Sequence, residues 1–261
     1  MRPLSELTPA EALAIDHFVF DLDDTLLDDG ALGERAYASL FRLREAGIQL
    51  VACTGRPAGW AEIVARQWPI EQAIAENGAV AWQRNGAGRV VLWDPAPAGE
   101  RAERRRRLLA LRDEILRGLP EMTLADDNGG RITDITFDIG EHRRVDPPIV
   151  DSARALAIAA GVETFTSSVH FHITLDKTDK AAGFIAAGAA LAGNGRSFAR
   201  AGFAGDSSND AAAFAAFGVS FGVANVRRHL HALPMPPTFV SDGEMGAGFA
   251  EIAEAIVAKR R

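Results

Sequence analysis

The chain has 261 residues, of which 48% are hydrophobic and 24% are charged, and its formal net charge is −7. These fractions predict a globular protein with a hydrophobic core and exclude an intrinsically disordered chain. The acidic balance argues against a general nucleic-acid binder. The single cysteine, Cys53, excludes a disulfide scaffold and favours a reducing compartment.

The first residues of the chain favour a short helix over a targeting segment. They lack the apolar stretch of a signal peptide. Thr8, Pro9 and Glu11 suit the N-cap, first and third positions of a helix. No apolar run reaches the roughly 18 residues that a membrane span needs. We therefore expect a cytoplasmic protein with neither a membrane nor a nucleic acid as its partner.

Short apolar runs alternate with helical patterns along much of the chain. The predicted strands are 17–21, 48–53, 71–76, 200–205, 219–223 and 238–240. The predicted helices are 31–46, 61–67, 179–191, 210–217 and 249–258. This alternation, with near-continuously apolar strands, is typical of a parallel sheet that is covered on both faces. The expected fold class is α/β, with a doubly wound, mainly parallel sheet.

The middle of the chain has a different pattern. A turn at 86–88 between the apolar stretches 79–82 and 90–93 predicts a hairpin, and 101–119 and 149–160 are helical. Segments 132–139 and 169–175 alternate apolar and polar residues, which indicates a sheet with one face in water. We expect residues 83–176 to form an inserted α+β cap domain, and 1–82 with 177–261 to form the core.

Two aspartates follow the first predicted strand in the string VFDLDDTLL, residues 19–27. Asp21 and Asp23 are two positions apart, so strand periodicity places both side chains on one side. In open α/β sheets the ligand crevice lies beyond the carboxyl ends of the strands. Two carboxylates there repel each other and raise one pKa unless a cation lies between them.

Two further strings bring a hydroxyl, a glycine and an ammonium group. In VACTGR, residues 51–56, a strand delivers Thr54 and then Gly55, whose backbone can approach a ligand closely. In LDKTDKAAGF, residues 175–184, Lys177 and Lys180 lie near the start of a helix.

A second pair of aspartates occurs in GFAGDSSNDAAAF, residues 202–214. A predicted strand ends before Asp206, and Asp210 follows as a helix opens. A helix start favours one carboxylate, whereas two together suit a hard cation.

In this order and spacing the four strings resemble the four motifs of the haloacid dehalogenase-like superfamily of phosphotransfer enzymes. VFDLDDT resembles motif one, ACTGR motif two, Lys180 motif three and GDSSND motif four. The insert, with AENGA at 75–79 and GVAN at 222–225, is similar to subfamily IIB, the Cof-type, sucrose-phosphate and mannosyl-3-phosphoglycerate phosphatases. Lys180 suits motif three better than Lys177 because it starts the Ala-rich helix.

The resemblance implies a mechanism and a set of roles. Asp21 is implied as the nucleophile that forms an aspartyl phosphate, and Asp23 as the general acid and base. Mg²⁺ is the implied cofactor, held by Asp21, the Asp23 carbonyl and Asp206, with Asp210 as a ligand or beside one. The groups implied to bind phosphoryl oxygens or substrate are Thr54, Lys180, Asn209, Gly55, Arg56 and Asn77.

Several of these residues have an ordinary alternative. Arg56 pairs equally well with a surface acid, and Asn77 suits a turn at a hinge. The arginines of 101–107 suit a solvated helix face better than a nucleic-acid site. His170 and His172, on the polar side of a strand near Ser168, are candidates for substrate binding, but no further His or Cys nearby supports a metal site.

The sequence thus predicts a Mg²⁺-dependent phosphomonoester hydrolase acting on a small phosphorylated metabolite, with a sugar phosphate as the expected class. A phosphomutase on the same core and a catalytically idle module that binds a phosphorylated ligand are the alternatives. The small-molecule substrate is the expected partner, and the chain is expected to act as a monomer or homodimer.

Overall fold

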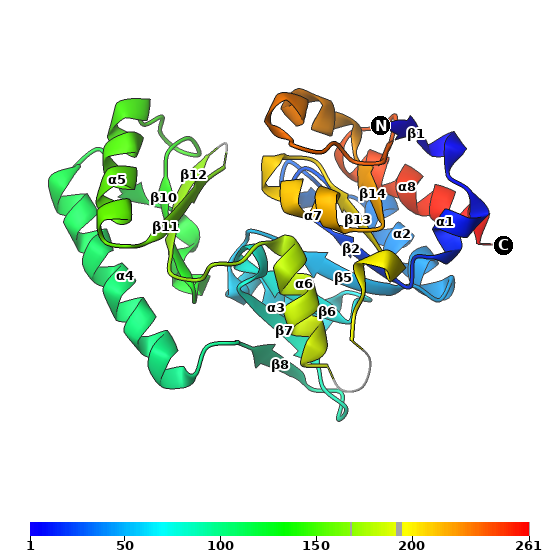
Figure 1. The fold of residues 1–261 in the computed structure, drawn as a ribbon, viewed down its shortest axis with the longest axis horizontal. Helices are drawn as coiled ribbons and strands as arrows, with labels where there is room; N and C mark the ends of the chain where they lie inside the picture. Colours follow the sequence, from blue (N-terminus) through cyan, green and yellow to red (C-terminus); the bar gives the residue numbers. More distant parts are fainter. Residues whose placement is uncertain (168, 192–194, 261) are drawn as a thin grey trace.

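A computed structural model describes residues 1–167, 169–191 and 195–260 of the chain (Figure 1). Ser168, one of the residues placed beside the cap histidines by the sequence, lies outside the described residues. In the part of the chain that is described, no helix is long and apolar enough to cross a membrane.

The strands belong to two main sheets and one short ribbon. They are β1 (Arg2–Pro3), β2 (His17–Phe20), β3 (Leu27–Asp28), β4 (Ala31–Leu32), β5 (Gln49–Cys53), β6 (Gln72–Ala75), β7 (Val80–Arg84), β8 (Val90–Trp93), β9 (Thr123–Leu124), β10 (Asp134–Asp138), β11 (Glu163–Thr166), β12 (His170–Thr174), β13 (Ala201–Gly205), β14 (Val219–Gly222) and β15 (Phe239–Val240).

The helices connect and cover these strands. The α-helices are α1 (Pro9–Leu13), α2 (Glu34–Glu45), α3 (Ala58–Gln67), α4 (Ala98–Gly118), α5 (Pro147–Ala159), α6 (Lys180–Ala189), α7 (Ala211–Ala216) and α8 (Met245–Lys259). The 3₁₀ helices are η1 (Leu4–Glu6), η2 (Glu76–Gly78), η3 (Asp126–Gly130), η4 (Phe198–Arg200), η5 (Ser208–Asp210) and η6 (Ala224–Ala232). The predicted cap of the first helix is confirmed, since Thr8 and Glu11 form a capping box.

The larger sheet has nine strands in the order β1-β15-β14-β13-β2-β5-β6-β7-β8. From β1 to β6 every neighbouring pair is parallel, and β7 and β8 add an antiparallel hairpin at one edge. The predicted fold class, α/β with a mainly parallel sheet, is confirmed.

Helices cover both faces of this sheet, and β2 shows why its strand is apolar throughout. Phe18 and Phe20 pack with α2, α3 and α8 on one face, and Val19 packs with α6 and α7 on the other. All three side chains are 0% exposed. A strand that is buried on both faces needs an uninterrupted apolar run, which is what residues 18–20 supply.

The smaller sheet is antiparallel, with the order β11-β12-β10-β9. Its apolar residues, Ile135, Phe137, Phe171 and Ile173, form a separate core with α4 and α5. Figure 1 shows these elements, in green, to one side of the larger sheet. The predicted alternation along both central strands is therefore confirmed, but the prediction that the polar face lies in water is wrong. On that face Asp134, Thr136, His172 and Thr174 are at most 7% exposed. Contacts within the chain, such as that of Arg131 Nη1 with Asp134 Oδ2 at 2.9 Å, take the place of water there.

Three local predictions need correction. The predicted helix 31–46 begins only at Glu34, because 31–32 pairs with 27–28 as a short ribbon. The predicted strand 132–139 begins at Asp134, because the N–H groups of Ile132 and Thr133 donate to the side chain of Glu76 instead of to a neighbouring strand. The basic face of α4 is only partly solvated, because Arg101 pairs with Asp94 and Asp176 at 2.8 and 2.6 Å.

The division into a core of residues 1–82 with 177–261 and a cap of residues 83–176 stays a proposal, which we refine at one boundary. β8 pairs with β7 in the larger sheet, so residues 90–93 extend the core sheet. Residues 98–174 carry α4, α5 and the smaller sheet with its own core. We therefore propose that the cap begins after Trp93.

Candidate active site

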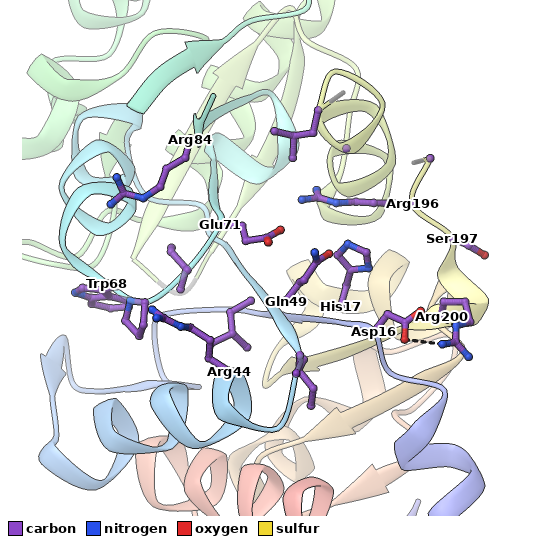
Figure 2. A pocket seen from close by; sticks show the side chains of 18 residues that line it. Asp16, His17, Arg44, Gln49, Trp68, Glu71, Arg84, Arg196, Ser197 and Arg200 are labelled. Atoms are coloured by element: carbon purple, nitrogen blue, oxygen red, sulfur yellow. Dashed lines mark hydrogen bonds and ion pairs between the residues drawn. The ribbon is translucent and has the colours of Figure 1, made fainter. Parts of the chain in front are cut away.

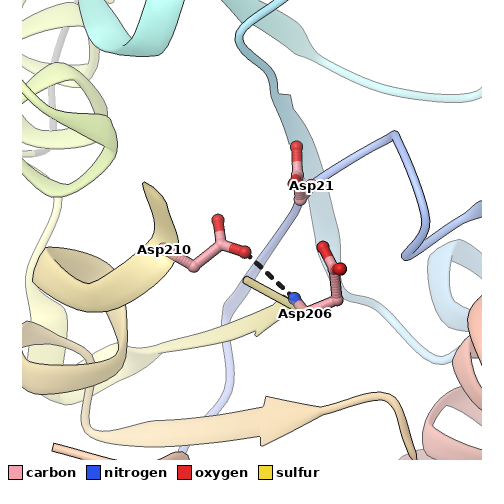
Figure 3. Close-up of side chains that lie close together, drawn as sticks. All are labelled: Asp21, Asp206 and Asp210. Atoms are coloured by element: carbon pink, nitrogen blue, oxygen red, sulfur yellow. Dashed lines mark hydrogen bonds between the residues drawn. The ribbon is translucent and has the colours of Figure 1, made fainter. Parts of the chain in front are cut away.

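Three aspartates meet at the carboxyl edge of the larger sheet (Figure 3). β2 ends immediately before Asp21 and the neighbouring parallel strand β13 ends immediately before Asp206. Asp210 lies one short turn later, in η5. One carboxylate oxygen from each lies within 4.8 Å of the others, and all three residues are at most 4% exposed.

Backbone and side-chain contacts fix these carboxylates. The Asp206 N–H donates to Asp210 Oδ2 over 3.0 Å. Thr25 Oγ1 and Asn225 Nδ2 donate to the two oxygens of Asp206, over 3.2 and 3.1 Å. Neither Thr25 nor Asn225 was among the predicted site residues, although both occur in the strings DLDDT and GVAN that carried the resemblance.

Lys180 brings a positive charge to the same cluster. Its Nζ lies 2.9 Å from Asp21 Oδ1 and 2.6 Å from Asp210 Oδ1, and the residue is 1% exposed. Asp179 caps α6 by accepting from the Ala182 N–H, which places Lys180 at the first position of the helix. Lys177 is exposed and pairs instead with Glu163 at 2.9 Å.

The charges of the cluster do not balance. Burial raises the pKa of Asp21 to about 7; Lys180 opposes this rise, whereas Asp210 adds to it. Burial, with Asp210 and Asp21 nearby, raises the pKa of Asp206 to about 8. Burial lowers the pKa of Lys180, but Asp21 and Asp210 more than reverse this, so its net shift is upward. One ammonium group thus faces three carboxylates.

This donor set fits a hard divalent cation. Carboxylate oxygens are the preferred ligands of Mg²⁺. A cation beside the three carboxylates would offset the burial and the repulsion that raise the pKa values of Asp21 and Asp206. Asp21, Asp206 and Asp210 are the residues that would hold it.

Asp23 lies at the exposed rim of this site, with its side chain 46% exposed. Arg56 Nε lies 2.9 Å and Nη2 2.5 Å from Asp23 Oδ1. The guanidinium also lies over the ring of Trp60, 4.0 Å from its centre. Of the two interpretations of Arg56, the structure therefore shows a pair with an acid, and that acid is the predicted general acid and base.

The segment after β5 brings three predicted residues together. Thr54 is 1% exposed, and its Oγ1 accepts from the Arg56 N–H over 3.0 Å. A Cβ on Gly55 would lie 3.2 Å from the Asn77 amide. Asn77 has a left-handed backbone, with φ of 55°, and its N–H donates to the Thr54 carbonyl over 3.0 Å. Among the described residues, its buried Oδ1 has no hydrogen-bond partner.

The other predicted substrate residues have neighbours of their own. Asn209 is exposed, and its Oδ1 accepts from Ser207 Oγ over 2.8 Å. His170 Nε2 lies 2.8 Å from Glu141 Oε2.

His172 is held within the smaller sheet. It is 4% exposed, its Nδ1 lies 2.9 Å from Asp134 Oδ2, and its ring stacks on Phe165 at 4.2 Å. Burial lowers its pKa, although Asp134 opposes the shift. These contacts favour a structural part for His172, and its role toward substrate stays a prediction.

A cavity of about 1190 Å³ lies at the amino-terminal ends of the parallel strands of the larger sheet (Figure 2). Its lining includes His17 and Gln49, the first residues of β2 and β5, together with Arg44, Arg196 and Arg200. Since the aspartates follow the opposite ends of the strands, this cavity is separate from the candidate site, and none of the predicted site residues lines it.

Comparison with known proteins matches part of the chain to a family. Residues 18–98 match the model of the haloacid dehalogenase-like hydrolases. This stretch contains the strings that resemble motifs one and two. The match confirms the resemblance predicted from the motifs and indicates a hydrolytic enzyme. A search of curated protein sequences finds no match.

Solved structures of this haloacid dehalogenase-like fold cover nearly the whole chain. A protein from Thermoplasma acidophilum is 20% identical with a TM-score of 0.70, covering 93% of this chain and 98% of its own. A protein from Bacteroides thetaiotaomicron, studied among the phosphatases of the haloalkanoate superfamily, is 17% identical with a TM-score of 0.63, covering 97% and 98%. A trehalose-6-phosphate phosphatase related protein is 17% identical with a TM-score of 0.61, covering 93% and 97%. At these identities the likeness establishes the fold.

Proposed function

We propose that this haloacid dehalogenase-like hydrolase is a Mg²⁺-dependent phosphatase of a small phosphorylated metabolite, with a sugar phosphate as the expected class. The observation that carries the proposal is the buried cluster of Asp21, Asp206 and Asp210 with Lys180 in contact. Similarity in fold to proteins described as phosphatases, one of them related to trehalose-6-phosphate phosphatase, supports it.

In the proposed first step Asp21 is the nucleophile. Its carboxylate oxygen attacks phosphorus, the bond between phosphorus and the alcohol oxygen breaks, and Asp23 gives the alcohol its proton. Lys180 and the Thr54 hydroxyl bind phosphoryl oxygens as negative charge develops. A bound Mg²⁺ would supply further neutralisation of charge at Asp21, Asp206 and Asp210.

In the proposed second step the aspartyl phosphate is hydrolysed. Asp23 takes a proton from water, the water oxygen attacks phosphorus, and the bond to Asp21 breaks. In the structure Arg56 holds the Asp23 carboxylate. Asp23 must therefore leave this pair, or share it, while it transfers a proton.

Release of inorganic phosphate from a panel of sugar phosphates tests the proposal. We expect release with MgCl₂ and none with EDTA, and we expect Asp21→Asn to abolish it. Asp16→Asn is the matched control, because Asp16 precedes the other end of β2 and pairs with Arg200 at the surface. Phosphate that stays on an isomerised sugar would establish the phosphomutase instead. Binding of sugar phosphates without turnover would establish the idle binding module.

We also propose a cytoplasmic location and a monomer or homodimer. The location is proposed because the single cysteine, Cys53, favours a reducing compartment.

A further inference from the structure

The carboxylate of Glu76 makes an unusual set of contacts away from the aspartate cluster. The residue is 4% exposed. Its Oε1 accepts from the N–H groups of Ala58 and Ile132, both over 2.9 Å. Its Oε2 accepts from the N–H of Thr133 over 2.6 Å and from the Thr133 hydroxyl. All four partners are donors, so an ionised carboxylate satisfies each of them.

These donors come from both parts of the chain. Ala58 is the first residue of α3, which packs against the larger sheet, and the residue before it, Pro57, offers no side-chain cap. Ile132 and Thr133 lead directly into β10 of the smaller sheet. A carboxylate that only capped α3 would need the Ala58 donor alone. Here three of the four donors to Glu76 belong to residues 132–133, in the proposed cap.

The turn that carries Glu76 has a strained backbone, which indicates that the contacts of Glu76 fix its conformation. Glu76 and Asn77 have consecutive left-handed backbones, with φ of 50° and 55°. Such conformations are strained in residues with a side chain and persist where contacts fix them. Burial and the nearby Asp134 raise the pKa of Glu76, and the hydrogen bonds from Thr133, Ile132 and Ala58 oppose this rise. No ion pair to Glu76 occurs among the described residues.

The same turn is tied to the segment that carries Thr54. The Glu76 N–H donates to the Arg56 carbonyl over 3.1 Å, and the Asn77 N–H donates to the Thr54 carbonyl over 3.0 Å. From the smaller unit, Arg131 Nη1 donates to the Gly55 carbonyl over 3.2 Å. The junction at Glu76 and the predicted phosphate-binding segment are therefore neighbours.

We infer that Glu76 is a positioning residue for the proposed reaction: its carboxylate fastens residues 132–133 of the cap to α3, and so holds the cap over the Thr54–Arg56 segment. The inference rests on the proposed function for its kinetic part only. Since the cap selects the substrate in this arrangement, loss of the fastening weakens the use of a large substrate more than that of a small one.

Glu76→Gln tests the inference with little change in shape. The amide offers one acceptor oxygen, and its NH₂ group then faces N–H and O–H donors, which leaves buried donors unpaired. We expect the cap to open, with a larger radius of gyration by X-ray scattering and faster amide hydrogen exchange at 132–133. We expect kcat/KM for glucose 6-phosphate to fall about tenfold to one-hundredfold, chiefly through KM, with a much smaller fall for acetyl phosphate.

Two further variants make the test specific. Thr133→Val removes one donor from the cap side only, should reproduce part of the effect, and should add nothing in the Glu76→Gln background. It also keeps the test available if Glu76→Gln does not fold. Glu71→Gln is the matched control, because Glu71 is a half-buried glutamate at the other edge of the sheet, in the lining of the cavity there. It should behave as wild type.

The outcomes separate this inference from the proposed function. An unchanged radius and unchanged exchange at 132–133 in Glu76→Gln overturn it, as does an equal loss with both substrates that follows the melting temperature. If the wild-type protein hydrolyses no phosphate ester, the proposed function fails, while scattering and exchange still decide whether Glu76 fastens the cap.

Discussion

Replacing Asp206 by asparagine should stabilise the metal-free protein while it removes the response to magnesium. Asp206 lies within 4.8 Å of Asp21 and Asp210 through their carboxylate oxygens. Asparagine keeps the shape, and its amide still pairs with Asn225 Nδ2 through oxygen and with Thr25 Oγ1 through nitrogen. The substitution therefore removes charge without leaving either neighbour unpaired.

The magnitude follows from the distances and the shifted pKa. Two charges 4.8 Å apart interact by about 3.5 kcal/mol at an effective dielectric constant of about 20. Asp206 takes part in two such repulsions, which its attraction to Lys180 partly offsets. Loss of this charge should thus raise the free energy of unfolding by about 2–4 kcal/mol at pH 8.

The sign of the pH dependence is fixed by the direction of the shift. In the folded protein the pKa of Asp206 is raised from 3.8 to about 8. The folded state therefore keeps a proton that the unfolded state loses, so wild-type stability falls as the pH rises from 3.8 through about 8. Asparagine does not titrate. The advantage of Asp206→Asn should be small at pH 5 and largest at pH 8.

Urea unfolding in EDTA and in MgCl₂, at pH 5 and pH 8, measures both effects. Magnesium at tenfold its Kd should stabilise the wild-type protein by about 1.4 kcal/mol at pH 8, less at pH 5, and Asp206→Asn hardly at all. Asp16→Asn, at the surface, should change stability by less than about 0.5 kcal/mol. The reasoning is refuted if Asp206→Asn is less stable than wild type in EDTA at pH 8, or if its advantage does not change with pH.

Three other substitutions test the aspartate cluster, its lysine and the packing of α6. Asp21→Asn should lower kcat by about 10³-fold or more, since it removes the proposed nucleophile, and turnover above a thousandth of wild type would contradict that role. Lys180→Met should cost about 3–5 kcal/mol in EDTA at pH 8, because it leaves buried carboxylates without their ammonium partner; a loss under about 1 kcal/mol by urea unfolding would be inconsistent with this. Gly183→Ala places a Cβ 2.4 Å from the Gly78 Cα, so thermal unfolding should show a loss of about 1–3 kcal/mol. Gly118→Ala meets no atom within 4 Å and is its control, and equal melting temperatures for the two would contradict the overpacking.

The convergence of the aspartates was predictable because it depends on topology alone. Parallel strands that are joined through helices end at the same edge of a sheet, so residues that follow β2 and β13 meet there whatever their separation in sequence. Asp21 and Asp206 follow those strands directly, and Lys180 opens a helix on the same sheet. A run of hydrophobic residues followed by a polar residue therefore predicts, from a short stretch of sequence, that the polar residue lies at this edge.

The ends of a strand were less predictable where hydrogen-bond partners far along the chain, and not the pattern of apolar residues in the strand, determine them. The pattern at 132–139 reads as one strand, yet Ile132 and Thr133 give their N–H groups to Glu76, which is 56 and 57 residues away. The short strands β9 and β11 escaped prediction for a related reason. Their pairing with β10 and β12, rather than a periodic pattern of their own, defines them.

The Glu76 junction shows where inference from residue type stops. In AENGA the glutamate reads as one more polar residue beside a glycine turn, and nothing nearby in sequence marks it as buried. Its burial depends on the donors of residues 132–133 and on the N–H of Ala58, which has no acceptor within helix α3. These donors come together when the cap is docked. A buried carboxylate requires such donors, because an unpaired charge in the interior costs on the order of several kcal/mol. The burial of Glu76 therefore depends on the position of the cap, and it could not be predicted from the sequence without that position.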